Sequence, residues 1–236
     1  RMRARQQIKD GYKVVGDDLW PMRDEVCSRV AYDFRGADTA IKLCKKLEVA
    51  IQAGGCVGSW PRYLRTIFSK VYTFEPSSEN YGLLVRNLGD LDITRYHAAL
   101  SDKVGRCGLK LNPQNCGDDQ TIEGDEVDTL TIDWLEVDPD LIYLDIQGDE
   151  CLALKGARKT LQRCSPIIGV EVDRKLTQLK GDAVALLTVL AIHVHDHVAL
   201  TDGQADIGDG SLSPPAADLE LILKVDACDL THGQLP

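Results

Sequence analysis

The sequence predicts an α/β fold built on a mostly parallel sheet with helices packed on it. From Glu48 onward, short apolar runs alternate with segments of helical periodicity, which is the pattern of a parallel α/β sheet. The first run leads into a glycine-rich turn, and the C-terminal segment ends in two runs typical of an antiparallel edge. The four core strands are expected at Val49–Ala53, Val71–Phe74, Leu141–Ile146 and Ile167–Val172.

Length and charge narrow the class of protein. A chain of 236 residues with 44% hydrophobic residues is long enough for one large domain with a single core. The 37 acidic residues outnumber the 27 basic ones, giving a net charge of -10, which disfavours nonspecific binding to nucleic acid. We expect an N-terminal arm and helical extension over residues 1–37 and the main domain over residues 38–236.

Helices are expected between the strands. Asp38 can cap a helix that continues to Leu47, and Ser59 and Ser77 can cap the helices that follow the first two strands. A further helix is expected after Asp149. These helices cover the faces of a parallel sheet.

The C-terminal segment is expected to form a helix over Leu176–Leu190 and two antiparallel strands, Ala191–Leu200 and Leu219–Val225. Alternate positions of the first strand carry His193, His195 and His197, a spacing that could bind a metal ion. Because no cysteine or carboxylate cluster accompanies them, we interpret these histidines as the outer face of an edge strand and predict no metal site.

The glycine-rich turn is the first candidate binding element. It reads Gln52-Ala53-Gly54-Gly55-Cys56-Val57-Gly58-Ser59 and joins the first strand to a helix. Glycines allow a ligand to approach the backbone, and a helix N-terminus offers free N–H groups. A tight strand-to-helix corner without a ligand is the alternative interpretation.

Glu75 ends the second strand, 21 residues after Gly54. A carboxylate at this position accepts hydrogen bonds from ribose hydroxyls, so the turn and Glu75 together indicate a ligand that contains adenosine. A solvated glutamate at a strand end is the alternative. A dinucleotide is disfavoured, because Ala53 stands where the G-x-G-x-x-G pattern has its first glycine.

Several motifs in fixed order resemble the FkbM-type family of S-adenosylmethionine-dependent methyltransferases. The segment Ile142–Glu150 is similar to the family signature I-K-I-D-V-E-G-x-E. The other matching segments are the turn with Gly54 and Gly58, Val71–Pro76, Ala98–Asp102, Leu130–Asp133, Leu154–Ala157 and Pro166–Glu171.

The resemblance implies a Rossmann-like class I methyltransferase fold with seven strands and S-adenosylmethionine as cofactor. It also implies roles for particular residues: Asp145 and Glu171 as catalytic carboxylates that accept a proton or anchor the acceptor, and Gln52, Gly54, Gly55, Gly58, Glu75, Ser101 and Asp102 as the cofactor site. The expected reaction is O-methylation of a sugar, a glycan or a small-metabolite hydroxyl.

Four positions depart from the family pattern. Gln52 replaces the usual Asp and Cys56 the usual Asn, while Tyr143 replaces Lys and Gln147 replaces Glu. Gln52 can still accept a hydrogen bond from the α-ammonium group of the cofactor, although a charged acceptor would bind about twice as strongly. The chain resembles Q-A-G-G variants of the family found among phage-like sequences.

Three alternatives remain open at this point: a nicotinamide-dependent oxidoreductase, a catalytically silent protein with the same fold, and a phage-type enzyme that acts on modified nucleic acid. Residues 112–125 form either a lid over the acceptor or an ordinary surface loop. The eight scattered cysteines, without a C-x-x-C pair, favour reduced thiols and a cytoplasmic location. No secretory signal or membrane span is predicted, and the oligomeric state is not predicted.

Overall fold

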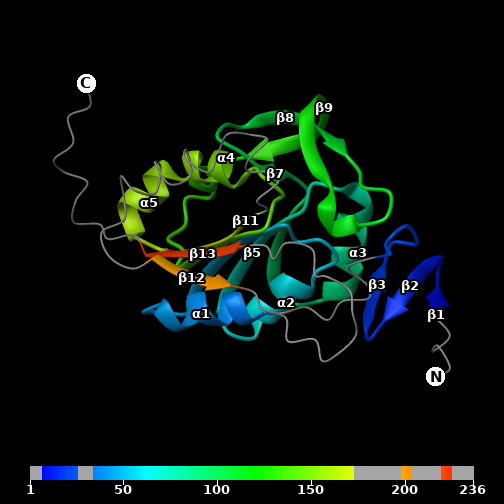
Figure 1. The fold of residues 1–236 in the computed structure, drawn as a ribbon, viewed down its shortest axis with the longest axis horizontal. Coiled ribbons are helices and arrows are strands. Elements are labelled where there is room, and N and C mark those ends of the chain that lie inside the picture. The colour runs from blue at the N-terminus through cyan, green and yellow to red at the C-terminus, as the bar shows by residue number, and fades with distance from the viewer. Residues whose placement is uncertain (1–6, 26–33, 173–197, 203–218, 225–236) are drawn as a thin grey trace.

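The computed structural model describes residues 7–25, 34–172, 198–202 and 219–224. Its centre is a seven-stranded sheet (Figure 1). In chain order the strands are β4 (Val49–Ala53), β5 (Lys70–Phe74), β6 (Ile93–Tyr96), β10 (Leu141–Leu144), β11 (Ile167–Val172), β12 (Val198–Asp202) and β13 (Leu219–Lys224). Their order across the sheet is β12-β13-β11-β10-β4-β5-β6.

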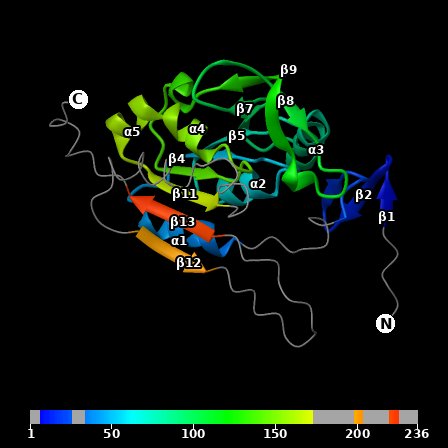
Figure 2. The same cartoon turned by 45° about the horizontal axis from the view of Figure 1, so that its top comes forward.

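The five strands from β11 to β6 are parallel, while β13 is antiparallel to both of its neighbours. The mostly parallel sheet and its antiparallel edge are therefore confirmed. Figure 2 shows β13 lying between β11 and β12. β12 starts at Val198, so the expected helix Leu176–Leu190 and the three histidines lie outside the described residues.

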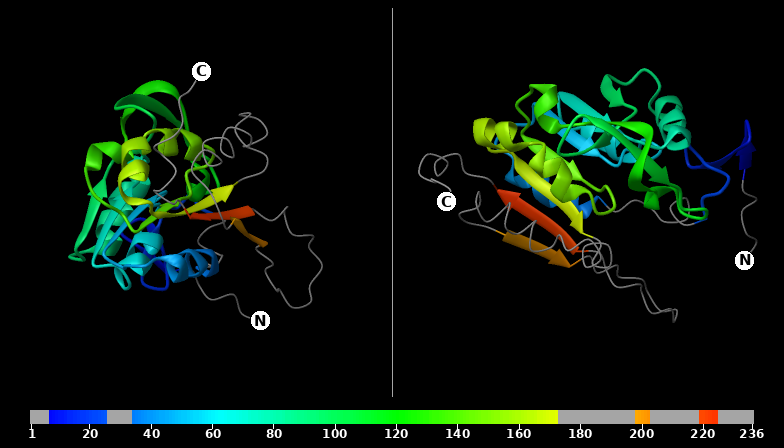
Figure 3. Two further views of the ribbon diagram at one scale, coloured as in Figure 1. Left: turned by 90° about the vertical axis from the view of Figure 1, so that its left-hand side faces the viewer. Right: turned by 90° about the horizontal axis from the view of Figure 1, so that it is seen from above.

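Helices cover both faces of the sheet (Figure 3). Neighbouring residues of β4 point to opposite faces, since Ile51 belongs to one apolar cluster and Ala50 to the other. The helices on the Ile51 side are α4 (Glu150–Lys155) and α5 (Arg158–Cys164); those on the Ala50 side are α1 (Arg35–Leu43), α2 (Ser59–Arg65) and α3 (Ser78–Leu88).

The helix starts differ in detail from the expectation. α1 begins at Arg35 rather than after Asp38, whose carboxylate accepts a hydrogen bond from the Tyr63 hydroxyl instead of capping the helix. α2 has Gly58 at its N-cap position, with Ser59 as the first helical residue. Ser77 occupies the N-cap position of α3 as predicted, without a side-chain capping bond.

The N-terminal segment differs most from the expectation. Residues 7–20 are not helical but form a three-stranded antiparallel sheet of β1 (Gln7–Lys9), β2 (Tyr12–Val15) and β3 (Asp18–Trp20). Its turns contain Asp10, Gly11 and Gly16 with positive φ, which suits tight hairpins. The Leu19 backbone exchanges two hydrogen bonds of 2.9 Å with the Asn87 side chain of α3. This segment therefore packs on the main domain, and the boundary at residue 38 stays a prediction.

A second small sheet was not predicted from the sequence. It contains β7 (Ala99–Leu100), β8 (Gly105–Lys110) and β9 (Gln120–Leu130), in the order β7-β9-β8. Residues 123–126 of β9 are exposed, so this part of the strand lacks the apolar alternation by which a half-buried strand is recognised. Two short 3-10 helices, Cys116–Asp118 and Ile132–Leu135, flank β9.

Candidate functional site

A cavity of about 270 Å³ lies at the carboxyl ends of the central parallel strands. Gly54 follows β4, Glu75 follows β5 and Asp145 follows β10, and all three line it. This is where ligands bind in open α/β sheets. The other lining residues are Ala53, Cys56, Trp60, Phe74, Pro76, Asn80, Ala98, Ala99, Leu100, Asn115, Cys116, Gly117, Asp118, Asp119, Thr121, Ile146, Gln147 and Asp149.

The glycine-rich turn brings two strand ends very close together. The φ of Gly54 is 83°, and a Cβ added there would lie 1.8 Å from the Asp145 carbonyl oxygen. Asp145 in turn donates its backbone N–H to the Ala53 carbonyl at 3.1 Å. The other two glycines do not line the cavity but shape the turn, because a Cβ on Gly55 would lie 2.6 Å from Leu84 and Gly58 has a φ of 103°.

Gln52 is fully buried and does not line the cavity. Its Nε2 donates to the carbonyls of Ala53 and Gly54, and its Oε1 accepts from the Thr73 hydroxyl at 2.6 Å. In the parallel register between β4 and β10, Gln52 lies opposite Tyr143, which is also fully buried. The Gln52 amide therefore stabilises the backbone of the glycine-rich turn by hydrogen bonds to its first two carbonyls.

Glu75 is 4% exposed and lies between two backbone donors. One carboxylate oxygen accepts from the N–H of Cys56 and the other from the N–H of Ser77, both at 2.8 Å. Burial raises the pKa of Glu75 to about 8, and the two backbone hydrogen bonds oppose that rise. A buried carboxylate facing a cavity, in contact with the glycine-rich turn, is suited to hold hydroxyl donors of a ligand.

Asp145 reaches the cavity from the end of β10, and its Oδ1 accepts a hydrogen bond of 3.1 Å from Gln147 Nε2. Gln147 and Gly148 both have positive φ, and Glu150 Oε1 accepts from the N–H groups of Ile146 and Gly148. Burial raises the pKa of Glu150. Residues 145–150 therefore form a tight turn that is held by the Glu150 carboxylate. This turn places Asp145 in the lining of the cavity.

The remaining candidate residues lie elsewhere. Ser101 and Asp102 do not line the cavity; the three residues before them, 98–100, do. The Glu171 backbone lies in β11 opposite Glu220 of β13, and its side chain is outside the described part of the structure. Their expected roles stay predictions.

The loop 112–119 supplies the lining residues that the sequence did not single out one by one. Asn115 to Asp119 and Thr121 line the cavity, so this part of residues 112–125 borders the candidate site. A role as a lid over the acceptor stays a prediction. Asn80 of α3 donates to the Cys116 carbonyl at 2.8 Å. Asn80 lines the cavity, and its buried Oδ1 has no hydrogen-bond partner within the described part of the chain.

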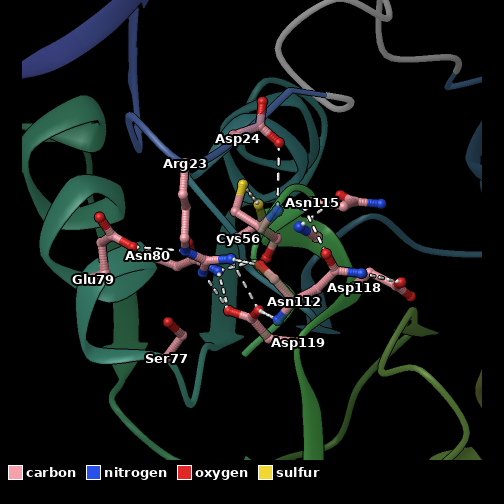
Figure 4. Close-up of polar contacts among 12 residues, drawn as sticks. Arg23, Asp24, Cys56, Ser77, Glu79, Asn80, Asn112, Asn115, Asp118 and Asp119 are labelled. Carbon is pink, nitrogen blue, oxygen red and sulfur yellow. Dashed lines mark hydrogen bonds and ion pairs between the residues drawn. The ribbon is translucent and has the colours of Figure 1, made fainter. Parts of the chain in front are cut away.

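The N-terminal segment clamps this loop (Figure 4). Arg23 pairs with Asp119 at 2.6 Å and with Glu79 of α3 at 2.8 Å, and it also donates to the Asn112 carbonyl. Asp24 accepts from the Cys116 N–H at 3.3 Å. The clamp thus joins three segments that are distant in sequence: residues 23–24, α3 and the loop over the cavity.

Replacing Arg23 with glutamine should loosen the loop. The Asp119 side chain is 5% exposed, so its carboxylate would lose a bidentate partner while still largely buried, at a cost of about 2 kcal/mol. Hydrogen exchange at residues 112–119 should accelerate, together with a lower free energy of unfolding in urea. Arg86→Gln is the matched control, because the Arg86–Asp10 pair is exposed and should contribute less than about 1 kcal/mol. Equal effects of the two changes would contradict the clamp.

The cavity is acidic. Among the lining residues of the described part of the chain, none is Lys, Arg or His, whereas five are carboxylates: Glu75, Asp118, Asp119, Asp145 and Asp149. Arg23, which does not line the cavity, forms an ion pair that compensates the charge of Asp119. Such a lining favours ligands with positive charge and disfavours phosphates.

The described ranges contain neither a metal-binding cluster nor a membrane-spanning helix. No three His, Cys, Asp or Glu side chains within these ranges are arranged to hold a metal ion. No helix in the same ranges is both long and apolar enough to cross a membrane.

The sequence also matches a known family. Residues 52–198, more than half of the chain, match the model of the methyltransferase FkbM domain. No curated protein matches the sequence.

Solved structures share the fold at low sequence identity. A methyltransferase FkbM from Methylobacillus flagellatus KT has a TM-score of 0.50 and 20% identity, and the match covers 75% of this chain and 43% of that one. A precorrin-6y C5,15-methyltransferase from Geobacter metallireducens GS-15 has a TM-score of 0.50 and 10% identity, covering 92% of this chain and 100% of that one. A tRNA (m1A58) methyltransferase from Aquifex aeolicus has a TM-score of 0.50 and 13% identity, covering 88% and 78%.

Proposed function

The chain belongs to the FkbM family of S-adenosylmethionine-dependent methyltransferases, and from this premise we propose that it transfers a methyl group to a hydroxyl of a sugar, a glycan or another small metabolite. The chain spans less than half the length of the FkbM methyltransferase structure it matches, 43%. The observation that carries the proposal is the buried Glu75 carboxylate, which faces the cavity beside the glycine-rich turn.

The residues present fit S-adenosylmethionine. Its ribose has two hydroxyl donors for Glu75, and Asn80, with its free acceptor Oδ1, lines the same cavity. Gly54 lines the cavity without a side chain, so the methionine part can approach its backbone. Ala98, Ala99 and Leu100 offer an apolar wall for the adenine. The acidic lining suits the sulfonium and ammonium charges.

When bound, S-adenosylmethionine supplies an electrophilic methyl group. The protein has to orient the acceptor for in-line attack, exclude water and take up the hydroxyl proton. We assign the proton to Asp145, because its carboxylate lines the cavity and Gln147 fixes its orientation. A glutamine at position 147 donates to Asp145, which an ionised glutamate, usual in the family, could not do. Glu171 stays a candidate for anchoring the acceptor.

The charge of the cavity guides the choice of acceptor. A neutral hydroxyl compound meets no repulsion there, whereas an RNA or DNA backbone would meet the aspartates of the lining and a net charge of -10. We therefore favour a small uncharged acceptor over nucleic acid. The many thiols fit a reducing compartment, so we propose a cytoplasmic location.

Calorimetric titration tests the cofactor. We expect micromolar binding of S-adenosylmethionine and S-adenosylhomocysteine and no binding of NAD. Binding of NAD alone would favour an oxidoreductase, and binding of neither would favour a silent protein with this fold. Transfer of a labelled methyl group to neutral sugars and glycans, compared with transfer to tRNA, then tests the acceptor.

Asp145→Asn should lower kcat with a hydroxyl acceptor by about 100-fold, because a positioned general base contributes at least that factor. The affinity for S-adenosylhomocysteine should change little, since the amide keeps the shape of the side chain. Asp90→Asn is the control, because Asp90 is exposed and does not line the cavity. An unchanged kcat in Asp145→Asn would remove Asp145 from the proton transfer.

The affinity for a ribose ligand should depend on pH. Ribose hydroxyls donate to the ionised form of Glu75, whose pKa is about 8. Below that pH, Glu75 must release its proton when the ligand binds, so the affinity should rise with pH by up to about tenfold per unit and level off above pH 8. The neutral probe 5′-methylthioadenosine has no ammonium group and isolates this effect. Calorimetry in two buffers of different ionisation enthalpy counts the released proton; no release at pH 7 would contradict the assignment.

A further inference from the structure

Two thiols lie side by side in the wall of the cavity. Cys56 belongs to the glycine-rich turn and Cys116 to the loop 112–119, and their sulfur atoms are 3.7 Å apart. Both residues line the cavity, with exposed fractions of 7% and 1%. A disulfide bond is about 2 Å long, so a small movement of the loop would bring the two sulfur atoms into bonding distance.

Backbone contacts hold the two thiols in this arrangement. The Cys116 N–H donates to Asp24, and its carbonyl accepts from Asn80. The Cys56 N–H donates to Glu75 at 2.8 Å, and Cys56 has a φ of 44°. A residue other than glycine in this conformation is uncommon. The pair is therefore coupled directly to the carboxylate assigned to the ribose.

We propose that Cys56 and Cys116 form a reversible disulfide that ties the loop 112–119 to the glycine-rich turn and prevents binding of the methyl donor. The proposal rests on the proposed function for its effect on the cofactor. It does not rest on that function for the formation of the bond itself.

Hydrogen peroxide is the proposed oxidant of the two thiols. One sulfur attacks a peroxide oxygen, the O–O bond breaks, and a sulfenic acid and one water form. The second sulfur then attacks the first, the S–O bond breaks, and a second water leaves. Two thiols and one peroxide thus give one disulfide and two waters, with two electrons passing from sulfur to oxygen. A dithiol reductant reverses the change.

The bond would act on the cofactor site in two ways. It draws Cys116 toward the turn and so narrows the cavity that both residues line. It also pulls on Cys56, whose N–H holds one oxygen of Glu75. Displacing that hydrogen bond leaves the buried carboxylate misplaced for the ribose.

The test uses the full chain, reduced and then treated with hydrogen peroxide. Peptide mapping by mass spectrometry without reduction should find a Cys56–Cys116 cross-link with the loss of two hydrogen atoms. Hydrogen exchange at residues 112–119 should become slower in the oxidised protein. Affinity for S-adenosylmethionine should fall by at least about tenfold, the effect of losing one hydrogen bond to a charged group. All three changes should disappear after dithiothreitol.

Two variants sharpen the result. Cys116→Ser should show no cross-link and no effect of peroxide on loop exchange or affinity, whatever its starting affinity. Cys107→Ser, a change in β8 at a residue that does not line the cavity, should respond as the unchanged protein does. A cross-link between other cysteines, or a Cys56–Cys116 cross-link that alters neither loop exchange nor affinity, would overturn the proposal. If the reduced protein binds no S-adenosylmethionine, the proposed function fails, while the cross-link and the exchange data still decide whether the disulfide forms and holds the loop.

Discussion

Above pH 8, where Glu75 is ionised, Glu75→Ala should weaken S-adenosylmethionine binding by at least about 100-fold. The carboxylate is the acceptor assigned to both ribose hydroxyls, and each hydrogen bond to a charged group contributes about 1.5–3 kcal/mol. The loss of two such bonds exceeds the 2.7 kcal/mol or so that corresponds to a factor of 100. Calorimetry with S-adenosylhomocysteine as a second ligand measures the change.

Two controls separate binding from folding. Alanine at position 75 also leaves the N–H groups of Cys56 and Ser77 without their acceptor, so Glu75→Gln, which keeps the shape, belongs in the same series. Glu75→Gln should bind weakly as well. The side-chain NH2 group is a donor, so it cannot accept from the backbone N–H it faces or from a ribose hydroxyl. Glu123→Ala removes an exposed carboxylate of β9 outside the cavity and should bind normally. Retention of affinity within about threefold in Glu75→Gln would contradict the role of the carboxylate.

Gly54→Ala should lower the free energy of unfolding by about 2–5 kcal/mol. The left-handed conformation costs a residue with a Cβ about 1–2 kcal/mol, and the new methyl group would overlap the Asp145 carbonyl oxygen at 1.8 Å, which adds about 1–3 kcal/mol. The contact is with backbone, so the ends of β4 and β10 have to separate. Urea denaturation measures the loss, and methyl transfer should fall with it because Asp145 moves.

Gly82→Ala is the matched control. Gly82 lies in α3 with nothing within 4 Å of an added Cβ, and alanine is the better helix former by about 0.5–1 kcal/mol. The same glycine-to-alanine change should therefore stabilise the protein at position 82 and destabilise it at position 54. A Gly54→Ala protein as stable as the parent would show that the strand ends are not in close contact.

The four central strands, which are buried between the two apolar clusters, could be predicted from the sequence. β4, β5, β10 and β11 have nearly unbroken apolar runs, because each is buried on both faces, and such runs are visible without tertiary information. β6 and β9 are polar along much of their length, so they were found only in the structure. The N-terminal strands were missed for a related reason: they are three or four residues long, and their packing partner Asn87 is distant in sequence.

The residues of the candidate site also divide into those visible from local sequence and those that depend on contacts distant in sequence. Glu75, Gly54 and Asp145 could be found because each directly follows a strand, and parallel strands end at one edge. Asn80, Cys116 and the clamp residue Arg23 could not, since their relation depends on how a loop folds back over the cavity. Gln52 directly precedes Ala53, which lines the cavity, so strand alternation turns the Gln52 side chain to the opposite face of the sheet.

The register that places Gln52 opposite Tyr143 links two departures from the family pattern. The positions that usually carry Asp and Lys are neighbours in the sheet, and both are fully buried here. Tyr143 stacks on Trp60 with 4.7 Å between ring centres, and Gly169 on the next strand leaves room for its ring. Gln52→Asp or Tyr143→Lys, made alone, would bury one charge without an opposite one, at a cost of about 3–5 kcal/mol. Substitutions at the two positions are therefore coupled. The charged pair can be exchanged for the neutral pair only through a less stable single variant or by changing both residues together.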